Sequence, residues 1–189
     1  MTTGRLPERT WRLRWLLLIS TAAVISLAWL LFPRRRLRYA VHALPANDRV
    51  LALTKEASFD TVVQLFSWRQ IEPTRDQYCW QYPDEVVEAA DYYGLDLVVR
   101  LDQHPQWANS APFTLNAPPD NLADYGRFVS AVATRYRGRV RAYIIWNEPN
   151  LAHEWAGRPA DPHGHHVILR EGYQAVKAAD PQALVVSAG

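Results

Sequence analysis

The sequence contains a single cysteine, Cys79, and only eight glycines among its 189 residues. One thiol excludes an intramolecular disulfide framework and any cysteine-rich zinc module. No glycine-rich phosphate loop follows the first apolar run of the body, which weighs against a dinucleotide-binding sheet. Charged residues make up 21% and hydrophobic residues 49% of the chain. The composition is therefore neither that of a disordered protein nor that of a fibrous one.

Positive charge is scarce in most of the chain. The 21 lysines and arginines outnumber the 19 acidic residues by two, but eight of the arginines lie in residues 1–38, where Glu8 is the single acid. The remaining residues therefore carry 13 basic and 18 acidic side chains. A nucleic-acid binder is expected to carry its positive charge on the folded domain, so this class of function is disfavoured.

One long uncharged run, residues 15–33, separates a basic tail, residues 1–14, from a basic linker, residues 34–38. As a helix the run would be roughly 28 Å long, close to the ~30 Å hydrocarbon core of a bilayer. Trp15 and Trp29 lie near its ends, where indole rings favour the membrane interface. A cleaved signal peptide has a shorter apolar region, and a buried helix is rarely flanked by arginines on both sides. We therefore predict a single-pass transmembrane anchor, whose orientation the charges leave open.

The body, residues 39–189, alternates between short apolar runs and amphipathic segments. The apolar runs are typical of strands that are buried on both faces of a parallel sheet, and the segments between them have the length of helical crossovers. Either a doubly wound sheet or a (β/α)8 barrel fits this α/β order. A complete barrel needs about 250 residues, so we predict an incomplete (β/α)8 TIM barrel of four βα units and a fifth strand. The expected strands are Tyr39–Ala43, Thr61–Phe66, Leu95–Leu101, Val140–Trp146 and Ala183–Ser187, and the expected helices run from about Asn47 to Ala57, Asp84 to Gly94, Leu122 to Gly138 and Val167 to Ala179.

The densest chemical signal is the segment Asn147-Glu148-Pro149, which follows an apolar strand at once. Pro149 cannot continue the hydrogen-bond ladder and biases Glu148 away from helical geometry. The carboxyl group is therefore expected at the carboxyl end of the strand, close to apolar surroundings that disfavour its ionised form. A carboxyl group that stays protonated at neutral pH can serve as a general acid. The alternative interpretation is a polar turn that happens to contain glutamate.

Polar and aromatic side chains follow the two preceding strands as well. Asp102 and His104 come after the third strand and Ser67 after the second, so all are expected at the same edge of a parallel sheet. Aromatic faces with nearby polar groups suit sugar rings. Tyr78 and Trp80 are expected instead to pack a helix onto the barrel. The tryptophans expected to surround one opening are Trp68, Trp107, Trp146 and Trp155.

Three segments carry a recognisable pattern: F-S-W-R-Q-I-E-P-T-R-D-Q-Y-C-W (Phe66–Trp80), L-V-V-R-L-D-Q-H-P-Q-W-A (Leu97–Ala108) and W-N-E-P-N (Trp146–Asn150). Together they resemble clan A glycoside hydrolases, the (β/α)8-barrel retaining glycosidases that include cellulases, β-galactosidases and β-xylosidases. The resemblance covers residues 39–189, and the Asn-Glu-Pro motif is its most specific part. Asp76 is a mild departure, since such enzymes often have glycine there.

The resemblance implies roles for several side chains. Glu148 corresponds to the catalytic acid/base, and Asn147 to the residue that hydrogen-bonds the 2-hydroxyl of the reacting sugar. The implied partner is a carbohydrate with a β-glycosidic bond, and the two-carboxylate chemistry needs neither a metal ion nor an organic cofactor. The residues that match positions of the sugar site are His104, Trp107, Trp68 and Trp155.

The resemblance also exposes a missing group. The family's nucleophile is a second glutamate at the end of the seventh strand, whereas this sequence reaches the fifth. Because retaining hydrolysis needs two carboxyl groups about 5–5.5 Å apart, we expect little or no glycosidase activity from this chain alone. A second chain could complete the barrel. The alternatives are a membrane-anchored carbohydrate-binding protein without turnover, or an inactive fragment. If the chain is an enzyme, its barrel is expected outside the cytoplasm.

Three histidines, His163, His165 and His166, lie close together in a segment rich in proline and glycine. Histidine is a common metal ligand, but the segment lacks the spacing and the supporting pattern of a metal site. We interpret the cluster as a solvated loop or the start of a helix, and we predict no metal site.

Overall fold

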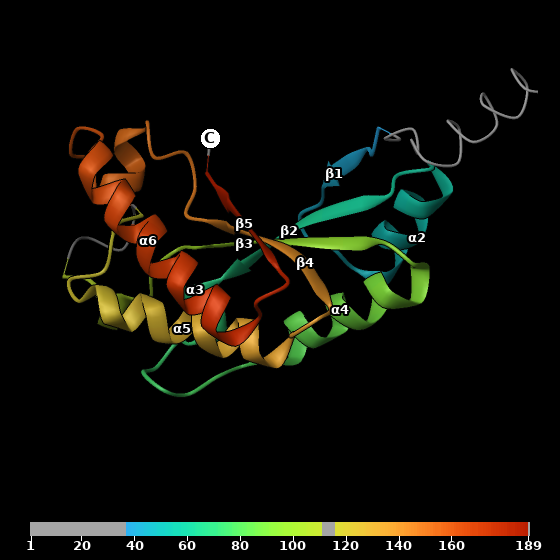
Figure 1. Ribbon diagram of the computed structural model, residues 1–189, viewed down its shortest axis with the longest axis horizontal. Helices are drawn as coiled ribbons and strands as arrows, with labels where there is room; N and C mark the ends of the chain where they lie inside the picture. Colours follow the sequence, from blue (N-terminus) through green and yellow to red (C-terminus); the bar gives the residue numbers. More distant parts are fainter. Residues whose placement is uncertain (1–36, 111–115, 189) are drawn as a thin grey trace, which may run out of the picture. The chain divides into compact units, whose positions relative to one another are not determined.

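The computed structural model describes residues 37–110 and 116–188. Five parallel strands form one sheet in the order β1-β2-β3-β4-β5 (Figure 1). Neighbouring strands follow one another in sequence through helical connections, which is the arrangement of consecutive βα units in a (β/α)8 barrel. The elements are β1 (Ala40–His42), α2 (Asp48–Glu56), β2 (Thr61–Ser67), α3 (Trp68–Ile71), α4 (Gln81–Tyr93), β3 (Asp96–Asp102), η1 (Gln106–Ala108), α5 (Leu122–Arg135), β4 (Val140–Ile145), η2 (Ala152–Trp155), α6 (Pro162–Ala179) and β5 (Leu184–Ser187).

Capping residues set several helix ends where the sequence indicates them. The side chain of Asn47 accepts a hydrogen bond from the backbone N–H of Val50 (3.0 Å) and so caps the start of α2. Gly94 ends α4 in a left-handed conformation at φ 61°, which glycine adopts at little cost. These short-range signals explain why α2 and the end of α4 lie where they are predicted.

Helix α6 begins earlier than its predicted start at Val167. The side chain of Asp161 accepts a hydrogen bond from the backbone N–H of Gly164 (3.0 Å), and Pro162 occupies the first turn. Proline suits this position because its missing N–H has no partner there in any case. The segment with His163, His165 and His166 is therefore the start of a helix, one of the two interpretations that the sequence leaves open.

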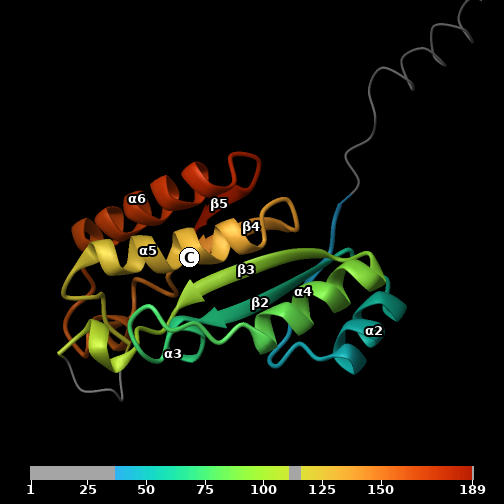
Figure 2. The ribbon, with the colours of Figure 1, turned by 90° about the horizontal axis from the view of Figure 1, so that it is seen from below.

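The helices cover one face of the sheet (Figure 2). On this face Phe66, Leu101 and Ile145 are fully buried, and α5 contributes Phe128 and Val132 to the same core. Burying side chains of this size stabilises the folded state by about 1.5–3 kcal/mol each. The hydrophobic core therefore lies between the sheet and its helices.

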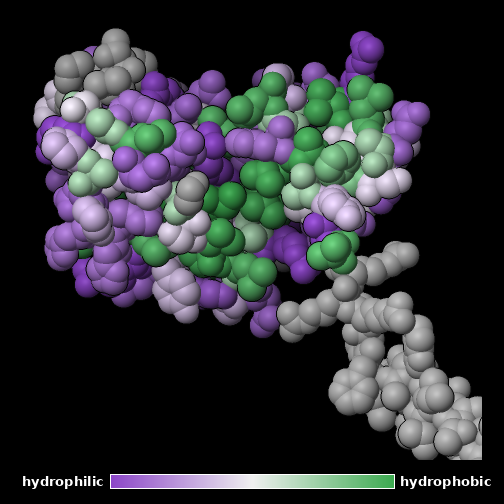
Figure 3. All heavy atoms as spheres, turned by 90° about the horizontal axis from the view of Figure 1, so that it is seen from above, coloured by the Kyte–Doolittle hydropathy of each residue, from purple (hydrophilic) through white to green (hydrophobic). Residues whose placement is uncertain are grey.

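The opposite face of the sheet is open in the described part of the chain. Val63, Val98 and Ile144, which alternate with the buried strand residues, are half-buried, and in β5 the exposed fractions of Leu184 and Val186 are 53% and 40%. Figure 3 looks onto this face and shows apolar residues gathered across its middle. The sequence pattern predicts strands that are buried on both faces. Burial is complete on the helix side, whereas on the other face several apolar strand residues stay half-buried or exposed.

No helix among residues 37–110 and 116–188 has the length and apolar character that crossing a bilayer requires. The predicted transmembrane anchor, residues 15–33, lies outside the described residues. The predicted fold class is corrected on this point: the structure is an α/β fold with a partial barrel, and the residues that it describes include no membrane-spanning helix. The same finding overturns the predicted single-pass membrane localisation.

Close packing of α6 on β4 gives a stability test. A Cβ atom on Gly172 would lie 2.8 Å from Ile145 Cδ1 and 2.9 Å from its Cγ2. We expect Gly172→Val to lower the free energy of unfolding by about 2–3 kcal/mol, because the fully buried Ile145 has little room to move away. Ala178→Val, on the exposed side of the same helix, is the control and costs about 0.5 kcal/mol through helix propensity. Urea unfolding measures both, and equal losses would contradict the close contact.

Candidate functional site

The strand register brings the predicted site residues to one edge of the sheet. Ser67 at the end of β2 lies opposite Asp102 at the end of β3, and Leu101 lies opposite Ile145 at the end of β4. The segments that follow these three strands therefore emerge side by side. This is the edge at which (β/α)8 barrels carry their active sites.

Glu148 lies directly beyond β4, and its side chain is exposed. Its backbone carbonyl oxygen accepts a hydrogen bond from the N–H of Leu151 (2.9 Å), which closes the turn that contains Pro149. The predicted position at the carboxyl end of the strand matches the structure, whereas the expected apolar surroundings do not. The carboxyl group is reachable from solvent, as a group that exchanges protons with a substrate must be.

Backbone strain is concentrated at this edge. Gln103, Trp146 and Glu148 have positive φ angles of 65°, 70° and 29° although none of them is glycine. Such conformations cost on the order of 1–3 kcal/mol each and persist where the surrounding structure enforces them, often at functional sites. The strain therefore marks the ends of β3 and β4 as the candidate site, in agreement with the motif.

A buried carboxylate, Glu154 in η2, organises the residues around the Asn-Glu-Pro turn. Its side chain is 4% exposed. Asn147 Nδ2 donates a hydrogen bond to its Oε1 (2.8 Å) and Asn116 Nδ2 donates to its Oε2 (2.6 Å). His153 Nε2 lies 3.2 Å from the same Oε1. Glu154, Asn116 and His153 carry no signal in the sequence, because no motif links them to Asn147 and only the folded loops bring them together.

His104, just beyond β3, is completely buried. Its Nδ1 accepts a hydrogen bond from the backbone N–H of Ala117 (3.0 Å), so in the neutral ring the proton is on Nε2. Burial lowers the pKa of His104, which favours this neutral form, although Asn116 Oδ1 opposes the shift because it could accept a hydrogen bond from Nδ1 in the protonated ring. Nε2 has no hydrogen-bond partner among the described residues. The ring therefore has one unused N–H donor at this edge of the sheet.

The structure places two of the predicted tryptophans in the core. Trp68 is fully buried, stacks on Phe128 at a centroid distance of 5.4 Å and donates its Nε1–H to Glu72 Oε2 (2.7 Å). Trp146 is fully buried as well and packs edge-on against Tyr125 at 5.9 Å. Both rings pack against α5 and so connect the ends of β2 and β4 to this helix.

The other two tryptophans donate hydrogen bonds to backbone carbonyl oxygens. Trp155 is buried and donates its Nε1–H to the carbonyl oxygen of Pro149 (2.7 Å), which connects η2 to the turn of Glu148. Trp107 is half-buried, donates to the carbonyl oxygen of Glu72 (3.0 Å) and carries the guanidinium of Arg75 4.6 Å from the centre of its ring. Among the four, Trp107 keeps the most side-chain surface for a ligand.

Asp102 is a buried carboxyl group at the end of β3, 1% exposed. Burial raises its pKa to about 6, although the cation of Arg100, whose Nε lies 2.8 Å from Oδ2, opposes the shift. The negative charge of Glu154 raises the pKa further, and the cation of Arg69 lowers it. Oδ1 has no hydrogen-bond partner in the described part of the chain. Asp102 therefore changes its charge close to neutral pH.

One group of side chains has the donor atoms for a metal ion. Glu148, His153 and Glu154 place one ligand atom each within 4.8 Å of one another. Two hydrogen bonds from amides and the contact with His153 already use the oxygens of Glu154, so the observed contacts account for this cluster without an ion. The residues His163, His165 and His166, which the sequence analysis considered, lie in the first turns of α6 and do not form such a group among the described residues.

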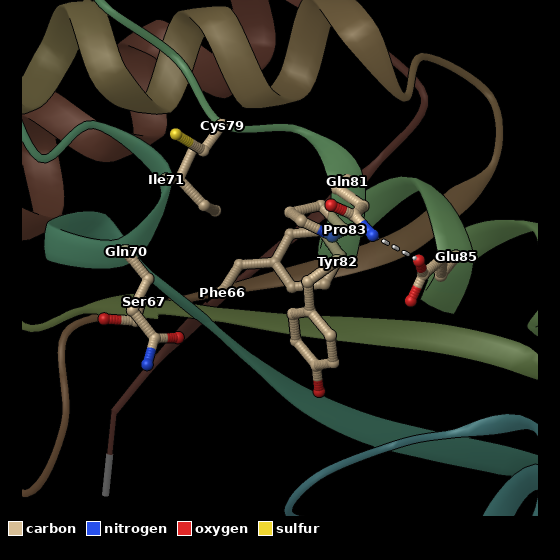
Figure 4. A pocket seen from close by; sticks show the side chains of 9 residues that line it. All are labelled: Phe66, Ser67, Gln70, Ile71, Cys79, Gln81, Tyr82, Pro83 and Glu85. Atoms are coloured by element: carbon tan, nitrogen blue, oxygen red, sulfur yellow. Dashed lines mark hydrogen bonds between the residues drawn. The ribbon is translucent and has the colours of Figure 1, made fainter.

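A separate cavity of about 220 Å³ lies between the end of β2, α3 and the start of α4 (Figure 4). Cys79, whose side chain is exposed, lines it, and Gln81 Nε2 donates a hydrogen bond to Glu85 Oε1 (3.2 Å) in its wall. Ligand sites typically measure about 300–1,000 Å³. Ser67 at the end of β2 lines this cavity, but Glu148, Asn147, His104 and the four predicted tryptophans do not.

No protein-family profile and no curated protein matches the sequence. Solved structures do match. A family 39 glycoside hydrolase from Bacteroides cellulosilyticus WH2 superposes with a TM-score of 0.64 at 19% identity over 78% of this chain and 30% of its own. Endo-glycoceramidase II from Rhodococcus sp. superposes with a TM-score of 0.60 at 20% identity over 75% of this chain and 43% of its own.

Xylanase 10B from Thermotoga petrophila RKU-1, solved in complex with xylobiose, superposes with a TM-score of 0.54 at 17% identity over 79% of this chain and 48% of its own. The chain thus spans between 30% and 48% of the length of these three structures. The similarity confirms the predicted resemblance to clan A glycoside hydrolases at the level of the fold.

The pKa of Asp102 gives a test of the site's electrostatics. The carboxyl group titrates near 3.8 in the unfolded chain and near 6 in the folded one, so the folded state binds more protons between these values. The contribution of Asp102 to the free energy of unfolding therefore falls as the pH rises from about 4 to about 6 and is constant above. Relative to Asp102→Asn, the wild type should lose about 2 kcal/mol across this window. Urea unfolding at several pH values measures it, and parallel curves for the two proteins would refute the raised pKa.

Proposed function

We propose that this chain forms part of a glycoside hydrolase site that acts on β-linked carbohydrate. The observation that carries the proposal is the position of Asn147 and Glu148 at the carboxyl end of β4, beside His104 at the end of β3, in a fold shared with glycoside hydrolases. At this edge Glu148 is exposed and the backbone around it is strained. These features support a reactive carboxyl group better than they support a polar turn.

In the proposed reaction Glu148 acts as the acid/base. Its protonated carboxyl group gives a proton to the glycosidic oxygen as the bond to the anomeric carbon breaks, and its carboxylate later takes a proton from the attacking water. Asn147 is proposed to bind the 2-hydroxyl of the reacting sugar. His104 offers its Nε2–H, and Trp107, whose ring is the most exposed of the four tryptophans, is proposed to contact the sugar. The buried Trp68, Trp146 and Trp155 are proposed to support the sugar site by holding its segments in place.

The proposed reaction also needs a second carboxylate that attacks the anomeric carbon. Glu154 brings a second carboxylate within 4.8 Å of Glu148, but both of its oxygens accept amide hydrogen bonds and its side chain is buried. It is therefore in no position to attack an anomeric carbon. The attacking carboxylate would have to come from outside the described residues, and a second chain that completes the barrel is one proposed source.

The two amide hydrogen bonds that Glu154 accepts also favour a second candidate function. A chain that keeps Asn147, His104 and Trp107 but has no free second carboxylate at this edge would bind carbohydrate without hydrolysing it. The two candidates share the sugar-binding step and differ in turnover alone.

Binding and hydrolysis can be measured separately. We expect the full chain to bind xylobiose in isothermal titration calorimetry, and Glu148→Gln to preserve this binding within about threefold, because the exposed side chain keeps its size. If the chain hydrolyses an aryl β-xyloside, Glu148→Gln should lower the rate about 10²–10⁴-fold, the usual contribution of a general acid.

Glu88→Gln, on the exposed face of α4, is the control and should change neither quantity. Binding without hydrolysis in the wild type would select the second candidate function. The absence of xylobiose binding would refute the proposed sugar site.

A further inference from the structure

Glu154 is a buried carboxylate whose partners all belong to the candidate site. Burying a carboxylate is costly unless hydrogen bonds or an opposite charge compensate it. Here the compensation comes from the amides of Asn147 and Asn116 and from the ring of His153. The carboxylate of Glu154 therefore connects the loop between β3 and α5 with the loop between β4 and α6.

The hydrogen bond from Asn147 fixes the orientation of its side-chain amide. Because Nδ2 donates to Glu154 Oε1 at 2.8 Å, the amide nitrogen faces Glu154 and the carbonyl oxygen Oδ1 faces away from it. An amide without such a partner can turn by 180° and exchange the positions of its donor and its acceptor. The side-chain amide of Asn147 thus presents its donor and its acceptor in one fixed orientation to a ligand beside Glu148.

The hydrogen bond from Asn116 to Glu154 connects Glu154 to the surroundings of His104. Asn116 donates to Glu154 Oε2 at 2.6 Å, and its Oδ1 accepts a hydrogen bond from the backbone N–H of His104 at 3.3 Å. The same Oδ1 lies 3.3 Å from His104 Nδ1. The orientation of the Asn116 amide, and with it the surroundings of His104, therefore depends on the carboxylate of Glu154.

We propose that Glu154 is a positioning residue of the sugar site, which acts by fixing the side-chain amide of Asn147 in the orientation that binds a sugar hydroxyl. This inference rests on the proposed function, since it assigns Glu154 a role in that same site. Glu154 does not touch the sugar. Its effect on sugar binding passes through Asn147, and to a smaller extent through Asn116 and His104.

Glu154→Gln is the sharpest test of this role. Glutamine keeps the size of the side chain, but one of its two terminal atoms is a donor and cannot accept a hydrogen bond from either asparagine. One of the two amides must therefore turn. We expect the affinity for xylobiose, measured by isothermal titration calorimetry on the full chain, to fall about tenfold, the effect of one misplaced hydrogen bond.

A double-mutant cycle separates positioning from general damage to the fold. Asn147→Ala should weaken xylobiose binding by itself, and Glu154→Gln should then cause a much smaller further loss in the Asn147→Ala background, because the main side chain through which Glu154 acts is gone. Asp180→Asn is the matched control. Asp180 is a buried carboxylate that accepts hydrogen bonds from backbone N–H groups at the other end of the sheet, and its variant should bind xylobiose within about twofold of the wild type.

A measurement on the wild type covers the case in which Glu154→Gln does not fold. The Nδ2 hydrogens of Asn147, assigned by their absence in Asn147→Ala, should exchange with solvent at least tenfold more slowly than those of the exposed Asn150 in nuclear magnetic resonance spectra. Equally fast exchange would overturn the proposal.

The calorimetric outcomes are decisive as well. An unchanged affinity in Glu154→Gln, or the same loss in both backgrounds, overturns positioning through Asn147. If neither the wild type nor Asp180→Asn binds xylobiose, the proposed function fails and the inference fails with it, a result distinct from a defect confined to Glu154→Gln.

Discussion

The carbonyl oxygen of Leu101 holds the candidate site together. It accepts a hydrogen bond from the backbone N–H of Trp146 (3.1 Å) and another from the hydroxyl of Tyr125 (2.7 Å). One acceptor thus joins the end of β3, the end of β4 and helix α5. The residues that follow each strand, among them His104 and Glu148, are consequently placed side by side at one edge.

This arrangement carries a cost in backbone strain, which packing offsets. The positive φ angles of Trp146 and Glu148 are unfavourable by on the order of 1–3 kcal/mol each. Trp146 is fully buried against Tyr125, and burial of a large aromatic side chain yields a stabilisation of similar size. The buried tryptophans are therefore better understood as the anchors that hold Glu148 in an exposed, strained turn than as the walls of an opening.

The sequence predicts the fold better than the site because the two depend on interactions of different range. Strand positions follow from local apolar runs, and the end of α4 follows from Gly94, so both are predicted within a few residues. The Asn-Glu-Pro motif gives the position of Glu148 for the same reason. Glu154 and Asn116 could not be found in this way, because their role exists only once two loops meet across 38 residues of sequence. The burial of Trp68 likewise depends on α5, a distant helix.

The strands themselves explain why sequence and structure disagree about burial. A strand in a closed (β/α)8 barrel packs one face against helices and the other against the barrel interior, so it is apolar on both sides. The helix side of this sheet is covered, and Phe66 and Ile145 are fully buried there. On the other side Leu184 and Val186 are exposed, in a chain that spans 30–48% of the length of structurally similar hydrolases.

The apolar pattern of these strands is thus the pattern of a barrel interior, of which the described residues form one wall. Glu148 lies beyond the end of that wall, in the turn after β4, and its side chain is exposed where the sequence pattern suggested apolar neighbours.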